Sequence, residues 1–437
     1  MTTTTNQFWN EAEGLSRPQL EELQRFRISK ILEHASHSPF YQKRLKEAGV
    51  SPSDIRGLDD IGKIPFTTKQ DLRDEYPYGF LCVPRDQLVR MHASSGTTGQ
   101  SVAVFYSRRD VEAWADLLAR CMYMTGARPG QTFQNLTGYG LFTGGLGFHY
   151  GAERLGLLTI PAGAGNSKRQ IQLMQDFSTN VIHIIPSYAL LLMDVFTDMG
   201  IDPRRDLNLR IAYLGAEPYS EEVRRRTEDF YGIKVYNSYG LSEMNGPGVA
   251  FECPHQSGMH IWEDSYLVEI VDPKTFEPVP DGEFGELVLT TLDREAMPIL
   301  RYRTKDITRI IPGECPCGRV HRRLDRMQGR TDDMFIIKGV NVFPMQIEQV
   351  LMNIPEVGNN YIIVLRRENN IDRLIVRVEV NDRVFVEDMR HLHRLRSKIA
   401  HDLRGEILVT PEVELVEPNS LPKGEGKAVR LIDERKL

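Results

Sequence analysis

Short apolar runs alternate with amphipathic segments between residues 100 and 250. Val181–Ile185 is a largely apolar run that ends at Pro186, and helical spacing follows it. A second run, Leu209–Leu214, ends at a Gly-Ala-Glu-Pro turn, and a charged helix is predicted from Ser220. This alternation predicts a layered α/β structure with buried strands, and ligands usually bind at the carboxyl ends of such strands.

The pattern changes on both sides of this layered region. Residues 8–50 carry apolar side chains at helical spacing, and residues 262–312 contain β-type runs such as Tyr266–Val271 and Glu286–Thr291. After Arg330, two strands, a helix and a last strand predict an α+β module of about 100 residues. The predicted fold class is therefore α/β. A large N-terminal layered domain (1–331) with a β-rich subdomain precedes a small, mobile C-terminal α+β domain (332–437).

Composition narrows the classes of function. The 437 residues are 41% hydrophobic with a net charge of −6, enough for at least two cores and without the basic excess of nucleic-acid-binding proteins. Neither a signal peptide nor an apolar run of about 18 residues is visible, so we expect no membrane segment. Five cysteines fit a reducing compartment, and we expect a cytoplasmic protein.

A loop rich in glycine and hydroxyl residues lies between two predicted strands, 87–93 and 102–106. Its N–H groups and hydroxyls can surround polyphosphate oxygens, because glycine permits close approach. No Gly-Lys-Ser/Thr follows, so it is not a Walker A loop, and alone it fits a polar hairpin turn equally well. Its residues are Ser94, Ser95, Gly96, Thr97, Thr98 and Gly99.

Four further polar strings are weak signals when each is taken alone. In chain order they are Tyr239–Glu243, Arg301–Asp306, Gly329–Asp333 and Leu421–Lys427. Taken separately, Tyr239–Glu243 indicates a solvated surface carboxylate, Arg301–Asp306 an ion-paired loop, and Leu421–Lys427 a flexible solvated tail.

Together and in this order, the five strings resemble the adenylate-forming superfamily of acyl-CoA synthetases, luciferases and peptide-synthetase adenylation domains. The resemblance spans residues 90–430. It implies that residues 94–99 form the phosphate loop, that Asp306 binds the ribose hydroxyls and that Lys427 is the catalytic lysine. The string Tyr239–Glu243 would be the adenine and magnesium motif. The further residues that the resemblance implies at the nucleotide are Gly215, Ala216, Glu217, Pro218, Tyr236, Asn237, Ser238, Tyr239, Gly240, Leu241 and Ser242.

The same resemblance implies four further roles. Glu243 would act in catalysis by holding Mg²⁺, a hard ion that prefers carboxylate and phosphate oxygens. Arg330 would donate to the ribose or the phosphates. Asp332 would be the hinge between the domains, and Lys338 and Gly339 would lie beside the path of coenzyme A.

The strings at Ile64–Leu72 and Ile336–Pro344 narrow the resemblance to phenylacetate–coenzyme A ligases. It implies two half-reactions: a carboxylate attacks the α-phosphorus of ATP and expels pyrophosphate, and the thiol of coenzyme A then displaces AMP. The expected ligands are an aryl acid, with phenylacetate the first choice, ATP with Mg²⁺, and coenzyme A. The alternatives are a benzoate-, anthranilate- or indoleacetate-like acid, a carrier-protein thiol as acceptor, or a non-catalytic nucleotide sensor. The sequence leaves a homodimer open.

The glycine-rich segment 135–145 is the predicted aryl-acid pocket. Tyr139 and Phe142 would supply flat apolar walls, and Gly145 would let the backbone come close. Ala216 and Tyr239 complete the predicted set. The alternative is that Tyr139 and Phe142 are ordinary core aromatics.

Cys315 and Cys317 lie in a tight Cys-Pro-Cys-Gly turn that presents two thiolates to one point. Cys253, with His255 or His260, could complete a tetrahedral Cys₃His zinc site. We favour His260, because a Cys-x-His pair is cramped. With four protein ligands the ion would be structural. The alternative is two reduced thiols in a turn and a core cysteine at position 253. We expect Cys82 and Cys121 to be buried thiols.

Overall fold

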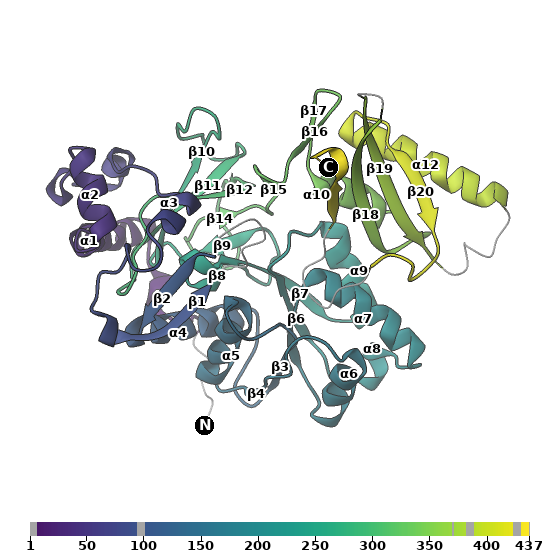
Figure 1. Cartoon of the computed structure of the whole chain (residues 1–437). Coiled ribbons are helices and arrows are strands. Elements are labelled where there is room, and N and C mark those ends of the chain that lie inside the picture. The colour runs from purple at the N-terminus through teal and green to yellow at the C-terminus, as the bar shows by residue number, and fades with distance from the viewer. Residues whose placement is uncertain (1–6, 94–100, 369–370, 382–388, 423–429, 437) are drawn as a thin grey trace.

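The computed structural model describes residues 7–93, 101–368, 371–381, 389–422 and 430–436 (Figure 1). A large N-terminal body precedes a small C-terminal domain, as the sequence predicts. The domain boundary placed between residues 331 and 332 remains a prediction. The predicted phosphate loop (94–99) and Lys427 lie outside the described residues.

The first described residues form helices that are fastened to a distant part of the chain. The Glu13 carboxylate is buried and accepts a hydrogen bond from Arg319 Nε at 2.7 Å. Helix α1 begins at Arg17 because Ser16 caps it and Pro18 occupies its first turn. The N-terminal helical elements are η1 (Glu11–Gly14), α1 (Arg17–Ala35), α2 (Pro39–Glu47), η2 (Pro52–Asp54), η3 (Leu58–Lys63), α3 (Lys69–Asp74) and η4 (Arg85–Gln87).

Nine strands form the central sheet, in the spatial order β13-β14-β9-β8-β7-β6-β5-β3-β4. The strands from β7 to β4 run parallel, and the others are antiparallel. The two predicted apolar runs are confirmed as β5 and β6. The strands are β3 (Thr132–Asn135), β4 (Leu158–Ile160), β5 (Val181–Ile184), β6 (Ile211–Gly215), β7 (Lys234–Leu241), β8 (Gly246–Glu252), β9 (Met259–Ile261), β13 (Ile310–Ile311) and β14 (Arg323–Leu324).

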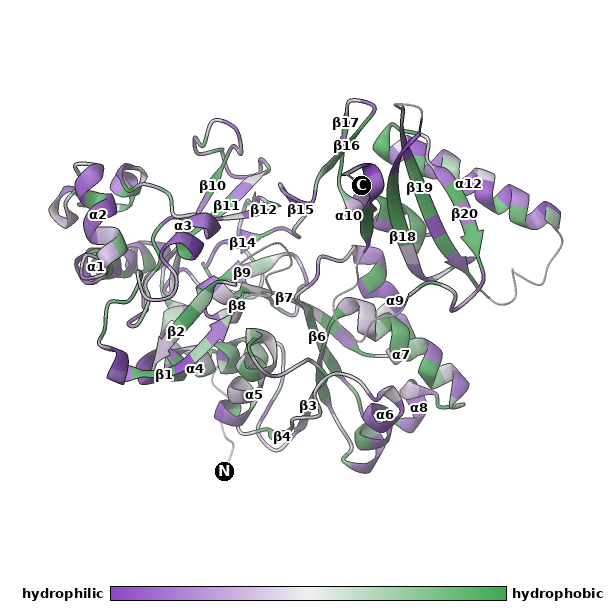
Figure 2. Cartoon of the chain, in the orientation of Figure 1, coloured by the Kyte–Doolittle hydropathy of each residue, from purple (hydrophilic) through white to green (hydrophobic). Residues whose placement is uncertain are grey.

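Helices cover both faces of the parallel part of this sheet. Ile211 and Tyr213 belong to the buried cluster that contains residues of α4 and α5, whereas Ala212 and Leu214 belong to the cluster of α6, α7 and α9. The central strands are mainly hydrophobic, and α6 and α8 present hydrophilic faces (Figure 2). The layered α/β prediction is confirmed. The helices are α4 (Arg108–Met124), α5 (Thr143–Leu155), α6 (Ser167–Asp176), α7 (Pro186–Asp198), α8 (Pro203–Asp206) and α9 (Glu221–Tyr231).

Two smaller sheets complete the large domain. An antiparallel hairpin confirms the strands predicted on either side of the Gly/Ser/Thr loop, and a four-stranded sheet in the order β10-β11-β12-β15 is the β-rich subdomain. The strands are β1 (Leu88–Ala93), β2 (Ala103–Ser107), β10 (Tyr266–Val271), β11 (Gly285–Thr291), β12 (Tyr302–Thr308) and β15 (Gly329–Arg330).

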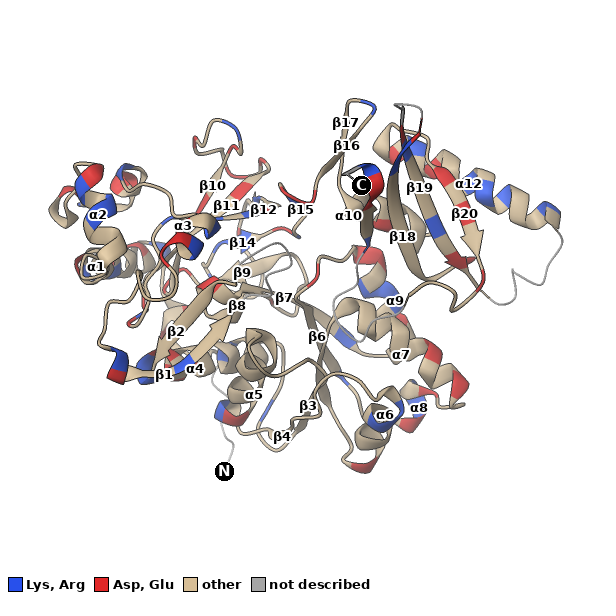
Figure 3. Cartoon of the chain, in the orientation of Figure 1, with Lys and Arg blue, Asp and Glu red and all other residues tan. Residues whose placement is uncertain are grey.

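The small domain is a mixed sheet, β20-β19-β18-β21, with two helices and a hairpin. Helix α12 buries one apolar stripe and carries many basic residues elsewhere (Figure 3). Strand β21 was not predicted. The elements are β16 (Phe335–Ile337), β17 (Val340–Val342), α10 (Pro344–Met352), β18 (Val357–Glu368), β19 (Ile371–Val380), α12 (Met389–Ile407), β20 (Glu412–Val416), β21 (Leu431–Asp433) and η6 (Glu434–Lys436). Across the described ranges, every helix is too short or too polar to be a membrane span.

Candidate active site

The predicted nucleotide-binding residues after the phosphate loop begin at the carboxyl end of β6. Gly215 lies so close to β7 that a Cβ there would be 2.3 Å from the carbonyl oxygen of Ser238. Ala216 has a φ of 69°, and the Glu217 carboxylate accepts hydrogen bonds from the N–H (3.1 Å) and hydroxyl (3.0 Å) of Ser187. The Glu217 side chain therefore fixes the start of α7 to the turn after β6.

Strand β7 turns alternate side chains in opposite directions. Asn237 and Tyr239 are partly exposed, whereas Tyr236 and Ser238 are buried. Burial raises the pKa of Tyr236 to about 12, and its ring lies in the hydrophobic core. Only the backbone of Tyr236 is thus left for the nucleotide role predicted for it. The buried Ser238 hydroxyl has no hydrogen-bond partner in the described part of the chain.

Asp306 joins the central sheet to the four-stranded sheet. The Tyr239 hydroxyl donates to Asp306 Oδ2 at 2.5 Å, and Arg330 Nη1 donates to Asp306 Oδ1 at 3.1 Å. Burial raises the pKa of Asp306, while the Arg330 guanidinium opposes that shift. An ionised carboxylate has about four acceptor sites, so Asp306 can still accept from two more donors.

The chain leaves β15 for the small domain through a charged turn. Asp332 pairs with Arg330 Nε at 2.9 Å and with Lys305 Nζ at 3.3 Å. Lys338 and Gly339 then form the two-residue turn between β16 and β17, with φ values of 50° and 81°. Both central residues of this turn need positive φ, which favours glycine at the second of them.

Glu243 lies in η5 (Ser242–Met244), directly after β7. Its carboxylate is buried and accepts from the Tyr302 hydroxyl at 3.2 Å, while Arg294 Nη1 holds its carbonyl oxygen at 2.6 Å. Burial and the Glu243 charge raise the pKa of Tyr302 well above its usual value, so Tyr302 is the donor. The ammonium of Lys69 lies 3.7 Å from Glu243 Oε1.

Sequence reasoning assigned no role to Lys69. Thr67 pairs with β12, because its N–H donates to Arg301 O (3.0 Å) and its carbonyl accepts from Arg303 N (2.9 Å). The adjacent Thr68 caps α3, and Lys69 is the first residue of that helix. A Thr-Thr-Lys-Gln-Asp string is a recognisable capping signal, but it does not say which carboxylate the lysine will face.

The predicted aryl-acid segment runs from β3 into α5. Asn135 Nδ2 donates to the Tyr139 hydroxyl at 3.1 Å and to Gly145 O at 2.7 Å. Tyr139 and Phe142 are only partly buried, unlike core aromatics. A Cβ on Gly145 would lie 2.5 Å from the carbonyl oxygen of Gly138, so this glycine lets helix α5 pack against the preceding loop.

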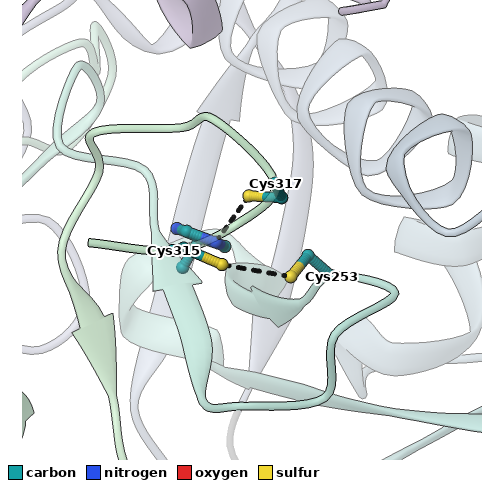
Figure 4. Close-up of side chains that lie close together, drawn as sticks. Cys253, Cys315 and Cys317 are labelled. Atoms are coloured by element: carbon teal, nitrogen blue, oxygen red, sulfur yellow. Dashed lines mark hydrogen bonds between the residues drawn. The ribbon is translucent and has the colours of Figure 1, made fainter. Parts of the chain in front are cut away.

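The four predicted zinc ligands converge on one point. Cys253 follows β8, His260 lies on β9, and Cys315 and Cys317 lie in the turn between β13 and β14; Figure 4 shows the three thiols. The three cysteine sulfurs and the ligating nitrogen of His260 all lie within 4.8 Å of one another. Within the described residues, His255, Cys82 and Cys121 are not in this cluster; Cys121 is buried, whereas Cys82 is only partly buried.

The donor set fits a tetrahedral zinc ion. Two Zn–S bonds of about 2.3 Å that meet at a tetrahedral angle hold their sulfurs about 3.8 Å apart. The sulfurs of Cys253 and Cys315 are 3.6 Å apart, and His260 Nε2 lies 3.2 Å from the sulfur of Cys317. His260 Nδ1 lies 2.9 Å from the carbonyl oxygen of His321, which fixes the ring with Nε2 facing the sulfurs.

Comparisons with known proteins agree with this architecture. The family of AMP-binding enzymes matches residues 26–291, and the AMP-binding enzyme C-terminal domain matches residues 339–435. The phenylacetate-coenzyme A ligase of Thermus thermophilus is 47% identical over 441 residues, which cover 98% of this chain and 99% of that protein.

Two solved structures of a 2-hydroxyisobutyryl-CoA ligase are similar over the whole chain. The one in the postadenylation state with a bound acyl-adenylate has a TM-score of 0.94 at 31% identity. The one with an acyl-adenylate and coenzyme A in the thioesterification state has a TM-score of 0.74 at 32% identity. Both alignments cover 100% of this chain and 94% of the other chain. The chain therefore belongs to the AMP-binding, adenylate-forming enzymes and, among them, to the phenylacetate–coenzyme A ligases.

Proposed function

We propose that the chain ligates phenylacetate to coenzyme A through an acyl-adenylate and releases AMP and pyrophosphate. The observation that carries this proposal is the convergence of Tyr239, Asp306, Arg330 and Glu243 where the central sheet meets the four-stranded sheet. The chain also matches a phenylacetate–coenzyme A ligase over almost its full length. Both half-reactions build negative charge on oxygen, so positioned cations and N–H groups supply most of the catalysis.

Each polar group has a role that its surroundings support. Asp306, with Arg330 beside it, accepts the ribose hydroxyls. Glu243 holds Mg²⁺, because its buried carboxylate has free acceptor capacity. Mg²⁺ would offset charge on the ATP phosphates. The loop at 94–99 and Lys427, both outside the described residues, are proposed to bind the phosphates and to stabilise the reacting carboxylate and α-phosphate.

The aryl group is proposed to lie against Tyr139 and Phe142, near Ala216. Asp332 is the proposed hinge, since its ion pairs with Arg330 and Lys305 lie between the large body and the small domain. Movement about this hinge would bring the Lys338–Gly339 turn to the path of coenzyme A.

The test is to measure the two half-reactions separately. We expect phenylacetate-dependent exchange of pyrophosphate into ATP, and thioester formation with free coenzyme A. Exchange without a thioester would indicate a carrier-protein acceptor, whereas nucleotide binding without exchange would indicate a sensor. Lys427→Ala should lose exchange and keep thioester formation from supplied acyl-adenylate. A panel of aryl acids then ranks phenylacetate against benzoate-like acids.

We also propose that Cys253, His260, Cys315 and Cys317 bind one structural Zn²⁺. The closed set of four protein ligands leaves no position for a substrate. Elemental analysis of untagged protein should give about one zinc per chain, and Cys317→Ser should lower that content. His255→Ala is the matched control and should leave the zinc content unchanged. Metal-free protein with all five thiols reactive in the native state would contradict this assignment.

A further inference from the structure

The contact between the two domains has an apolar centre and a polar edge. Helix α10 of the small domain packs against α9 of the large domain. Buried residues of both domains belong to one hydrophobic cluster, among them Leu190 on α7, Val223 on α9, and Ile347 and Leu351 on α10. This contact fixes where the small domain sits in the present arrangement.

Glu348 anchors one end of this contact. Its carboxylate accepts from the backbone N–H of Ser220, the capping residue of α9, at 2.9 Å, and from the hydroxyl of Tyr361 at 2.9 Å. Burial raises the pKa of Glu348. The buried carboxyl group therefore has partners on both domains.

Arg226 on α9 supplies the other end. Its Nη1 donates to the side-chain oxygen of Asn359 at 3.0 Å and to Gly358 O at 3.3 Å, and its Nη2 donates to Val357 O at 3.4 Å. Its Nη1 also donates to Met352 Sδ at 3.7 Å, so all four acceptors are on the small domain and none is charged. Among the described residues no carboxylate pairs with Arg226, and burial lowers its pKa.

Asn359 bridges two helices of the large domain. Its oxygen accepts from Arg226 on α9, and its Nδ2 donates to Asp194 Oδ1 at 3.1 Å and to Leu190 O at 3.4 Å on α7. The amide serves both sides, because its oxygen accepts from Arg226 and its nitrogen donates to Asp194. Asn359 is therefore matched to this one placement of the small domain.

The strength of this contact suits a step that must be reversed in every turnover. Hydrogen bonds to neutral acceptors are weaker than charge-paired ones, and Arg226 also loses solvation on forming them. A carboxylate in place of Asn359 Oδ1 would hold the guanidinium more firmly. The polar edge thus orients the small domain on the large domain without binding it strongly.

We propose that Arg226 and Asn359 are positioning residues that form a releasable latch for the postadenylation arrangement. The whole chain superposes more closely on the postadenylation ligase structure than on the thioesterification one, at nearly equal sequence identity. The latch contacts therefore belong to the first arrangement. They must separate if the small domain moves before coenzyme A attacks. This inference rests on the proposed two-step function.

The experiment separates the two half-reactions in single turnovers. For Arg226→Met and for Asn359→Ala, we expect the amount of enzyme-bound acyl-adenylate to fall about three- to tenfold, because the arrangement that retains it is less populated. Conversion of bound adenylate to thioester on mixing with coenzyme A should be no slower than in the wild type. The loss in the double variant should be smaller than the product of the two single losses, because Arg226 and Asn359 share one hydrogen bond. Arg226→Lys should restore part of the loss.

Arg225→Met is the matched control on the same helix. Arg225 is exposed and its nearest acidic partner is Glu221, at 3.7 Å, in the large domain, so both half-reactions should stay at wild-type levels. Thermal melting curves identify any variant that fails to fold. If Arg226→Met does not fold, the result for Asn359→Ala alone tests the latch. Equal changes in both half-reactions, additive effects in the double variant, or no change would overturn the latch. If wild-type protein forms no adenylate at all, the proposed function fails instead.

Discussion

Two buried glutamates in the large domain have opposite surroundings. Glu263 accepts four hydrogen bonds, from Arg17 Nη1 and Nη2 and from the backbone N–H and Nε of Arg322, at 2.7–3.0 Å. Glu243 accepts one from Tyr302, with Lys69 at 3.7 Å. A carboxylate has about four acceptor sites, so Glu263 is saturated and Glu243 is not. Both carboxylates are buried, but only Glu243 has unused acceptor sites. Glu243 can therefore bind a cation, whereas Glu263 stabilises the fold.

Substitution next to Glu263, the carboxylate whose acceptor sites are all used, should have the largest effect on stability. Asp264, next to Glu263, forms a buried two-bonded pair with Arg120 at 2.9 and 3.1 Å. Asp264→Asn leaves the buried guanidinium unpaired, so the free energy of unfolding should fall by about 3–5 kcal/mol in chemical denaturation. Asp206→Asn, at an exposed pair with Arg205, should change it far less, because solvent screens the pair. Equal effects would show that burial of the pair is unimportant.

Substitution of Glu243, the carboxylate with unused acceptor sites, should have the next largest effect, on the rate of pyrophosphate exchange. Glu243→Gln should slow pyrophosphate exchange about 100- to 1000-fold, because one stabiliser of the phosphates is lost. Its free energy of unfolding should stay within about 1 kcal/mol of the wild type. Glu263→Gln should give the reverse pattern, with a clear loss of stability and near-normal exchange per folded molecule. If the two variants behaved alike, acceptor capacity would not separate the regions.

Lys69 should contribute less than Glu243. Lys69→Met removes an ammonium that lies beside the proposed Mg²⁺ carboxylate, and we expect roughly 10- to 100-fold slower exchange, or about 1.4–2.8 kcal/mol. The neighbouring Lys63 pairs with Asp60 on the surface, so Lys63→Met should leave exchange unchanged. A normal rate for Lys69→Met would mean that this lysine only balances the charge of Glu243.

The smallest expected effect is on the pH dependence of stability, compared between Asp264→Asn and the wild type. Although burial favours the protonated form, Arg120 holds the pKa of Asp264 below its usual value. A lowered folded-state pKa stabilises the protein above the unfolded pKa of about 3.9, and this stabilisation is lost as the pH falls through the folded value. Denaturation at pH 5, 4 and 3 should therefore show a flatter pH dependence in Asp264→Asn than in the wild type. An unchanged slope would remove Asp264 as a source of acid lability.

Local signals predicted much of the fold. The apolar runs that became β5 and β6, and the paired strands β10 and β11, are continuous in sequence. Strand β21 has only three residues and pairs in parallel with β18, about 68 residues earlier in the chain, so no local pattern marks it. The Cys-Pro-Cys-Gly turn was predictable because its signal lies in four consecutive residues.

The candidate site was less predictable than the fold. Lys69 reaches Glu243 only because Thr67 pairs with β12, more than 230 residues later in the chain. Tyr236 was predicted to bind the nucleotide because it lies just before the Tyr239–Glu243 string, and strand alternation turns its ring into the core. The roles given to residues 94–99 and Lys427 stay predictions, because these residues lie outside the described ranges.

The bond between Glu13 and Arg319 has a consequence for synthesis of the protein. The two residues are 306 positions apart. At about 5–20 residues per second, a ribosome makes Arg319 roughly 15–60 s after Glu13. Glu13 therefore waits for this partner until Arg319 has been made, so this bond forms late in the synthesis of the large domain.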